Sequence, residues 1–449
     1  MSHKFLPLGL AGLLFVTATA MQAQVTNTVT VEVTGGTAQA AAVLQLEDTV
    51  REALHNNPAL QSALRTAQAE RRRVPQASSF PDPKLSVNWM GNITPFSVQT
   101  KDPSSYRGLA AMQELPFPGK RELRGEIAGR EADAAQADYD AVRRRLKAEV
   151  KNAYYDYWYY DKAVQVTVQN KDLLQKLSQI AAARYRVGKG IQQDVLKSQV
   201  ELSLLLQKLT MLQQQRATAA ARLTALLARR PEQPLPPPAD IPGATPLNYS
   251  MDQLYEFADR SDPGLQREQR MLERSQLAAN LAHKDYYPDL AVGYMYEQRP
   301  LLPDMHGFTF TVNIPVFYKS KQRQELAEAG EQVAAAEKNR QNRQNELNFQ
   351  VKQEYLAAKA SEQLLQLYSQ GVVPQSSLAL ESSMSAYQVG TVDFLSVLTN
   401  FSTVVSYQID YYRELANYQT SLAQLESVTG LELTSAAASP GGSIPGAKE

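Results

Sequence analysis

Two stretches of this chain are unusually long and free of helix-breaking residues. Residues 131–187 and residues 191–230 contain neither glycine nor proline. As a single α-helix the first stretch would extend roughly 85 Å, whereas an ordinary globular helix has about a dozen residues. The mean hydropathy of −0.37 fits long helices in contact with solvent better than a thick globular core. The chain is therefore expected to be built around long helices.

Apolar residues between positions 195 and 226 recur with a seven-residue period. Spacings of three and four residues place them on one side of a helix, where they pack against a neighbouring helix. Arg216 and Ser198 depart from this pattern. The two apolar seams consist of Val195, Leu202, Leu209 and Leu223, and of Leu205, Leu212, Ala219 and Leu226. We therefore expect the long helices to pack in antiparallel pairs.

Glycine residues lie where the long helices must reverse direction. Glycine readily adopts the positive φ that commonly ends a helix. The sequence predicts two turns at the far tips of the helical pairs, formed by Val187, Gly188 and Gly190, and by Val389, Gly390 and Thr391.

The chain contains an internal duplication. Residues 47–60 resemble residues 252–265, and residues 83–89 resemble residues 288–294 at the same offset. A proline-rich segment, residues 231–246, separates the two copies and is predicted to be an extended connector. Two copies are too few for a solenoid, which needs at least about three repeats.

Both copies have the same predicted order of elements. Each begins with a helix that carries a proline in its early turn, Pro58 or Pro263, continues with two strands, and ends with two long helices. The predicted segments are a signal peptide at 1–20 with cleavage as late as 23, an N-terminal extended segment at 24–45, repeat 1 at 46–230, the linker at 231–246, repeat 2 at 247–433 and a disordered tail at 434–449. The strands are expected at about 84–95 and 107–115, and at about 289–298 and 306–315. The long helices are expected at about 118–187 and 191–230, and at about 319–387 and 391–429.

Three of the four predicted strands alternate apolar and polar residues, and the alternation is weaker over residues 109–115. In one of them Phe308, Phe310 and Val312 alternate with Thr309 and Thr311, which places the apolar side chains on one face. Such aromatic-rich strands are typical of a lipid-facing barrel, and a half-buried soluble sheet is the alternative. Four strands cannot close a barrel, and an open sheet edge leaves unpaired backbone groups in hydrocarbon. If the strands face lipid, several chains would have to share one barrel, and three chains would give twelve strands.

Composition narrows the range of functions further. Lys4, an apolar core over 5–16 and Ala18-Thr19-Ala20 form a predicted secretory signal. The absence of cysteine excludes disulfides and thiolate sites, and the formal net charge of zero does not suggest a nucleic-acid partner. No nucleotide-binding loop, catalytic motif or metal-binding cluster is found, so we expect no enzyme activity, no cofactor and no metal site.

These features resemble the TolC family of outer-membrane efflux channels, over about residues 46–433. The resemblance rests on the duplication, on the strand pairs with their flanking Pro-x-Leu and Leu-Pro-Phe-Pro-Gly motifs, and on the two tip motifs. One tip motif has Asp194 six residues after Gly188, and the other begins with Ala386-Tyr387 and continues to Thr391. The resemblance implies a mainly helical fold, in which a homotrimer forms a periplasmic α-barrel of long hairpins and a shared twelve-stranded β-barrel in the outer membrane.

The same resemblance implies partners and a gate. The tip turns would contact a periplasmic membrane-fusion adaptor, which links the channel to an inner-membrane pump, expected to be of the RND type. Asp194 and Tyr387 match positions of the family's periplasmic gate and could hydrogen-bond to each other. Val392 stands where a family member has an arginine, and Ser396 and Thr399 stand where it has aspartates that narrow the pore.

We therefore predict the exit duct of a tripartite efflux pump, in contact with outer-membrane lipid, that passes small molecules or metal ions passively to the exterior. Residues 113–121 and 389–395 resemble the heavy-metal efflux branch of the family. The alternative is a periplasmic coiled-coil adaptor or spacer without a membrane barrel, which would share the long helices but would not need duplicated strands.

Overall fold

The computed structural model describes residues 43–91, 98, 102–241, 243–300 and 302–434. The predicted signal peptide, residues 24–42 of the predicted N-terminal segment and residues 435–449 of the predicted tail lie outside the described residues.

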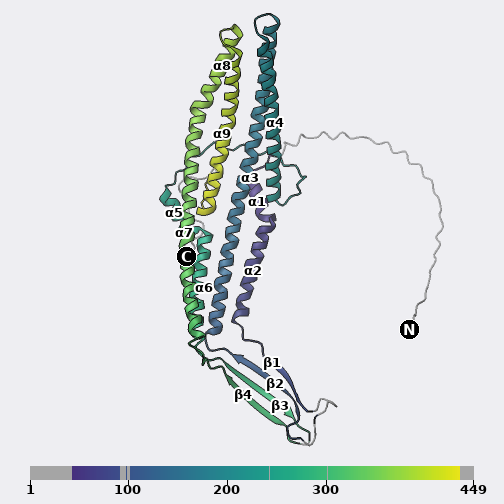
Figure 1. Ribbon diagram of the computed structural model, residues 1–449, viewed down its shortest axis with the longest axis vertical. Helices are drawn as coiled ribbons and strands as arrows, with labels where there is room; N and C mark the ends of the chain where they lie inside the picture. The colour runs from purple at the N-terminus through teal and green to yellow at the C-terminus, as the bar shows by residue number, and fades with distance from the viewer. Residues whose placement is uncertain (1–42, 92–97, 99–101, 242, 301, 435–449) are drawn as a thin grey trace, which may run out of the picture. The chain divides into compact units, whose positions relative to one another are not determined.

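The two repeats have the same order of elements (Figure 1). Repeat 1 comprises helices α1 (Leu46–Asn56) and α2 (Pro58–Ser78), strands β1 (Lys84–Met90) and β2 (Tyr106–Leu115), and helices α3 (Lys120–Arg186) and α4 (Gln192–Leu226). Repeat 2 comprises α5 (Met251–Ser261), α6 (Pro263–Lys284), β3 (Leu290–Gln298), β4 (Met305–Val312), α7 (Gln322–Leu367), a π-helix η1 (Tyr368–Val372), α8 (Val373–Val389) and α9 (Phe394–Thr429). This shared order confirms the internal duplication.

The proline near the start of each repeat divides the predicted first helix into two. A proline inside a helix lacks the N–H donor and clashes with the preceding turn, whereas the first helical position needs no such donor. Pro58 and Pro263 therefore begin α2 and α6. The preceding residues cap these helices: Asn57 accepts from two backbone N–H groups, and Asp262 accepts from the Leu265 N–H at 2.7 Å.

The long helix expected over 319–387 is likewise not one regular α-helix. It is interrupted by η1, directly before the first turn of α8, which contains Pro374. Because Pro374 cannot donate to the preceding turn and crowds the carbonyl there, a wider π-turn accommodates it. The counterpart in repeat 1, α3, has no proline and runs unbroken for 67 residues.

The long helix α3 organises the helical part of the molecule. It packs against α2 and α4 of its own repeat and against α6 and α9 of the other. The aromatic run in its middle is buried: Tyr154, Tyr155 and Trp158 are each 2 % exposed. None of the helices in the described residues is both long and apolar enough to cross a membrane.

The proline-rich linker packs against the middle of α3. Leu44 forms a parallel bridge with Pro238, and its carbonyl accepts from the Tyr154 hydroxyl at 2.9 Å. The Tyr157 hydroxyl donates to the Pro236 carbonyl at 3.3 Å. The connector between the repeats is therefore held against the helices by backbone and tyrosine hydrogen bonds.

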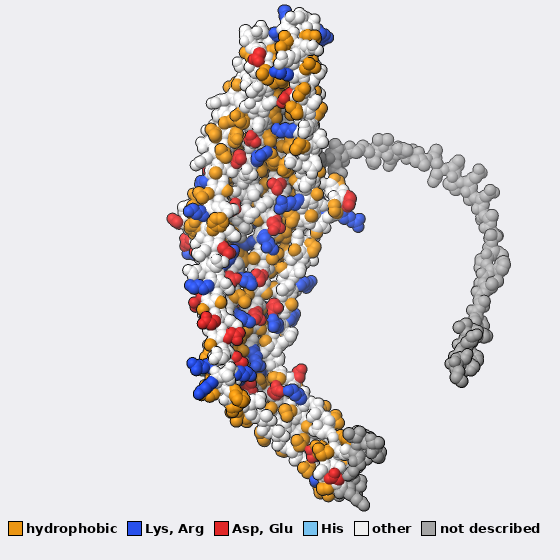
Figure 2. All heavy atoms as spheres, viewed as in Figure 1, with side chains coloured by type: hydrophobic (Ala, Val, Ile, Leu, Met, Phe, Trp, Pro, Cys, Tyr) orange, Lys and Arg blue, Asp and Glu red, His pale blue; other side chains and the backbone are white. Residues whose placement is uncertain are grey.

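The four strands form one antiparallel sheet in the order β1-β2-β3-β4. The register places Val87 opposite Leu109, and Tyr294 opposite Phe308. These side chains share one face, which we call the apolar sheet face: Leu85, Val87, Leu109, Leu290, Val292, Tyr294, Phe308, Phe310 and Val312, all of them exposed. Figure 2 shows mostly hydrophobic and uncharged side chains over the strands, in contrast to the mixed charges over the helices. The described part of β1 ends at Met90, and residues 92–95 of the predicted strand lie outside the described residues.

A buried lysine ties the two repeats together where the helices meet the sheet. Lys120 is 2 % exposed, and its Nζ lies 3.2 Å from an Asp285 oxygen, 3.0 Å from an Asp289 oxygen and 3.0 Å from the Tyr287 carbonyl oxygen. The Phe117 N–H also donates to Asp289, at 2.8 Å. Burial acts to raise the pKa of the Asp289 carboxyl, but the Phe117 N–H and the Lys120 ammonium outweigh it and lower this pKa.

Candidate functional site

Both predicted tip turns lie at the end of the helices opposite the sheet (Figure 1). Gly188 has a φ of +72° and Gly390 a φ of +85°, a backbone conformation that strains any residue with a Cβ. The first turn closes with the Lys189 N–H donating to the Arg184 carbonyl at 2.9 Å, and the second with the Thr391 N–H donating to the Ala386 carbonyl at 3.0 Å. The two repeats thus end their hairpins in equivalent ways.

The predicted gate residues come together across the two hairpins. Tyr387 at the end of α8 is 4 % exposed, and its hydroxyl donates to Asp194 Oδ2 in the first turn of α4 at 3.3 Å. The Tyr387 ring packs against Phe394, with ring centroids 5.1 Å apart. Burial, together with the negative charge of Asp194, raises the pKa of Tyr387 to about 12. The hydroxyl therefore remains protonated, and able to donate, throughout the physiological range.

The remaining predicted tip residues are mostly at the surface. Val187 is 68 % exposed and Val389 is 77 % exposed, so both turns present apolar surface to solvent. Thr391 is exposed, although its hydroxyl donates to the Ala386 carbonyl at 3.1 Å. Gly190 has intermediate exposure. Exposed apolar residues on a tight turn make a surface suited to a partner protein.

Arg184 is a contact residue that the sequence patterns did not single out. Its guanidinium extends from α3 to the end of α8, where it donates to the carbonyl oxygens of Tyr387 and Gln388, the second at 2.8 Å. It also lies over the Tyr387 ring, 4.7 Å from the centroid. One signal was available in the sequence: a basic residue in the last turn of a helix commonly binds exposed carbonyls. That signal does not say which helix supplies them.

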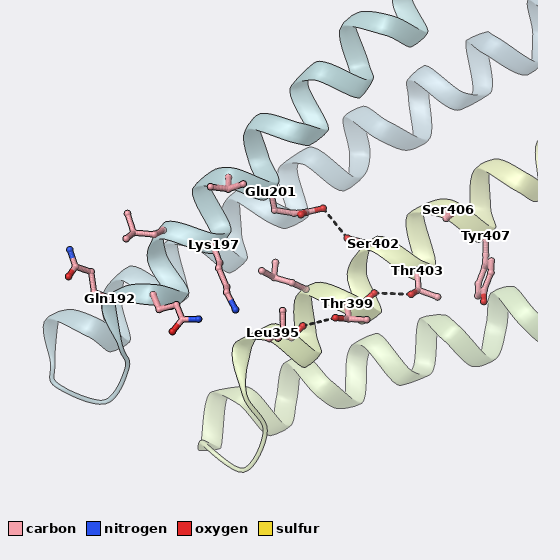
Figure 3. Close-up of a pocket in the computed structure, with 13 residues that line it drawn as sticks. Gln192, Lys197, Glu201, Leu395, Thr399, Ser402, Thr403, Ser406 and Tyr407 are labelled. Atoms are coloured by element: carbon pink, nitrogen blue, oxygen red, sulfur yellow. Dashed lines mark hydrogen bonds between the residues drawn. The ribbon is translucent and has the colours of Figure 1, made fainter.

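A groove of about 1020 Å³ lies beside the tips, between α4 and α9 (Figure 3). The Ser402 hydroxyl bridges it by donating to Glu201 at 2.9 Å. Apolar side chains of both helices line its walls together with Lys197 and Thr399. The groove thus offers both apolar and hydrogen-bonding contacts.

The positions at which this chain departs from the expected gate carry no carboxylate. Ser396 and Thr399 are exposed on α9, and Val392 is half-buried in the second turn. The Thr399 hydroxyl donates to the Leu395 carbonyl of its own helix at 3.0 Å. Among the described residues, no three His, Asp or Glu side chains are grouped to hold a metal ion.

Comparisons with known proteins agree with this arrangement. A family model described as outer membrane efflux protein matches residues 49–229 and 254–431, which is most of both repeats. The cobalt-zinc-cadmium resistance protein CzcC of Cupriavidus metallidurans is 24 % identical over 436 residues, covering 96 % of this chain and all of that protein.

Three solved structures show the same fold. The outer-membrane channel OprN has a TM-score of 0.75 at 18 % identity, covering 86 % of this chain and 89 % of that one. The outer membrane protein VceC of Vibrio cholerae has a TM-score of 0.73 at 17 % identity, covering 86 % of this chain and 96 % of that chain. A structure of CusC, described in terms of folding and transmembrane channel formation, has a TM-score of 0.72 at 17 % identity. The match covers 86 % of this chain and 92 % of that chain.

Proposed function

The chain belongs to the outer membrane efflux protein family, and from this premise we infer that three identical copies form one exit duct. As a family member it is an outer-membrane efflux channel that extends into the periplasm. The match to a channel family along both repeats is at odds with the alternative of an adaptor without a membrane barrel.

The single observation that best supports this trimeric assembly is the apolar sheet face. Nine apolar side chains on one face of the four strands are exposed, and Val87 and Phe310 are 79 % and 75 % exposed. Such a face is stable against lipid, but a bilayer does not tolerate unpaired sheet edges. In the sheet of the described residues, β1 and β4 each pair on one side. If three copies were arranged with β4 of one copy beside β1 of the next, every edge would be paired in a twelve-stranded barrel.

Exposed apolar stripes on the helices support the same assembly. On α4, Leu204 and Met211 are each at least half exposed, and their spacing of seven residues places them on one side of the helix. On α7, Phe349, Leu356 and Leu367 are similarly exposed along one side. Each repeat thus has an unpartnered helical surface, and pairing these surfaces between copies would close an α-barrel.

We further propose that the tips form the periplasmic gate. The Asp194–Tyr387 hydrogen bond would hold the two hairpins together in the closed state. The exposed side chains of Val187 and Val389, with Gly188, Gly190, Gly390 and Thr391, would meet a periplasmic membrane-fusion adaptor. An inner-membrane pump, of RND type by the family resemblance, would supply the energy. The duct itself would perform no chemistry, and opening would shift a two-state equilibrium of the tips.

Metal ions are the cargo that we propose. The support is the similarity to CzcC, whose name refers to resistance to cobalt, zinc and cadmium. A deletion strain should then become sensitive to these cations and regain resistance when the gene is restored. Sensitivity to organic drugs with unchanged metal resistance would refute the cargo assignment but not the duct.

The duct and its gate can be tested on purified protein. Cross-linking of an outer-membrane extract should yield a trimer, and the protein should conduct ions in planar bilayers. Asp194→Ala with Tyr387→Phe should increase the conductance, whereas Ser203→Ala, at an exposed position further along α4, should not change it. Conductance of the double variant equal to that of the wild type would refute the gate assignment.

A further inference from the structure

The C-terminal end of α8 is held by a side chain from the other repeat. Arg184 Nη1 donates to the carbonyls of Tyr387 and Gln388, and Nη2 donates to the Lys189 carbonyl at 3.1 Å. Carbonyls in the last turn of a helix lack intrahelical partners and lie at the negative end of the helix dipole. A guanidinium is well suited to them because its fork makes several charge-assisted hydrogen bonds at once.

The glycine of the second turn makes room for this arginine. A Cβ added at Gly390 would lie 3.2 Å from Arg184 Nη2, so the guanidinium packs closely against the backbone of this turn. The second tip thus contacts the first through the Arg184 side chain.

The same arginine also restrains the gate tyrosine. Tyr387 contacts Phe394 on one side, has the Arg184 guanidinium over its ring, and donates to Asp194 through its hydroxyl. The α8–α9 tip cannot move away from α3 without breaking the hydrogen bonds of Arg184 to the carbonyls of Tyr387 and Gln388. These bonds join two segments of one chain, so every subunit carries its own restraint.

We propose that Arg184 is the positioning residue of the gate: it fastens the second hairpin tip to the first and thereby keeps the Asp194–Tyr387 contact closed. This inference rests on the proposed function of the tips as a gate. Opening by a partner protein then requires release of this guanidinium from the end of α8.

The test is the conductance of Arg184→Gln and Arg184→Lys variants in planar bilayers. The glutamine variant loses the charge, and we expect its open-to-closed ratio to rise by about tenfold or more, the effect of losing a hydrogen bond to a charged group. The lysine variant should give a smaller rise, because an ammonium lacks the planar fork. Arg186→Gln is the matched control: Arg186 lies in the same helical turn, is exposed, and makes no side-chain hydrogen bond or ion pair among the described residues.

A positioning role is separated from a merely structural one by two further measurements. The trimer should remain as resistant to heat in detergent as the wild type, and Arg184→Gln should be non-additive with Tyr387→Phe. If the Asp194→Ala, Tyr387→Phe double variant opens the channel and Arg184→Gln does not, the inference is wrong and the gate stands. If no form of the protein conducts, the proposed duct is refuted, and the inference with it.

Discussion

The packing between the two repeats depends on a buried ion pair whose removal has a calculable cost. Lys151 of α3 and Glu426 of α9 form a salt bridge in which the side chains are 8 % and 4 % exposed. The second oxygen of Glu426 accepts from the N–H groups of Leu433 and Thr434, at 2.7 Å each. Lys151→Met would leave the buried carboxylate without its counter-charge.

Breaking a buried pair by removing one partner costs about 3–5 kcal/mol. Since Glu426 keeps its two N–H donors, we expect the lower end of this range, about 3 kcal/mol. A chain of about 400 folded residues has an unfolding entropy of roughly 0.8 kcal/mol/K, so the melting temperature should fall by about 4 °C. Helical circular dichroism of the purified protein in detergent, at a fixed concentration, measures this shift.

The double variant tests the physical cause. Glu426→Gln removes the charge but keeps an acceptor for the two N–H groups, so Lys151→Met with Glu426→Gln should recover at least half of the loss. Arg51→Met is the control, because the Arg51–Asp48 pair is 74 % and 66 % exposed and should contribute less than about 1 kcal/mol. A melting temperature of Lys151→Met within 1 °C of wild type, or additive effects in the double variant, would refute the reasoning.

Three further outcomes are expected. Phe310→Arg, on the apolar sheet face, should reduce the amount of protein in the outer-membrane fraction, because a basic residue facing lipid costs about 2–4 kcal/mol near the midplane. Thr311→Arg, on the other face, should leave that amount unchanged. An equal reduction in both variants would argue against a lipid-facing sheet. Gly390→Ala should destabilise the second tip by about 1–2 kcal/mol through its positive φ, measured as faster amide exchange there, whereas Gly330→Ala inside α7 should be neutral or stabilising. Because the pKa of Asp289 is lowered in the folded protein, its contribution to stability is present above the ordinary value of 3.8 and is lost as the pH falls below it; acid unfolding of Asp289→Asn should therefore depend less on pH than that of the wild type.

The features that the sequence determined are those with a local cause. Alternation with period two places Phe308 and Phe310 on the same face of any strand, and in the structure both are exposed on the apolar sheet face. Seven-residue spacing predicts that Leu205 and Leu212 pack against a neighbouring helix, and both are buried. The positive φ at Gly188 and Gly390 follows from a turn that other residues adopt only with strain. These patterns were sufficient for the mainly helical fold with a small sheet, because each depends on the geometry of a single element.

Sequence patterns alone did not predict how each helix accommodates its proline. A proline predicts a disturbance, but not whether it begins a new helix, as Pro58 does, or is accommodated by a π-turn, as Pro374 is. The choice depends on the residue before it and on the packing of the next turn. The hydrogen bond between Asp194 and Tyr387 was anticipated from the family resemblance, and composition or spacing did not predict it.

Tertiary structure alone decided which distant residues meet. Arg184 and the end of α8, Lys151 and Glu426, and Lys120 and Asp289 are pairs from opposite repeats, brought together by the packing of α3, α6 and α9. A charged residue on a long polar helix looks the same in sequence whether it faces solvent or a partner. Its role depends on burial and on the group opposite it, and both are properties of the packed helices rather than of the residue's neighbours along the chain.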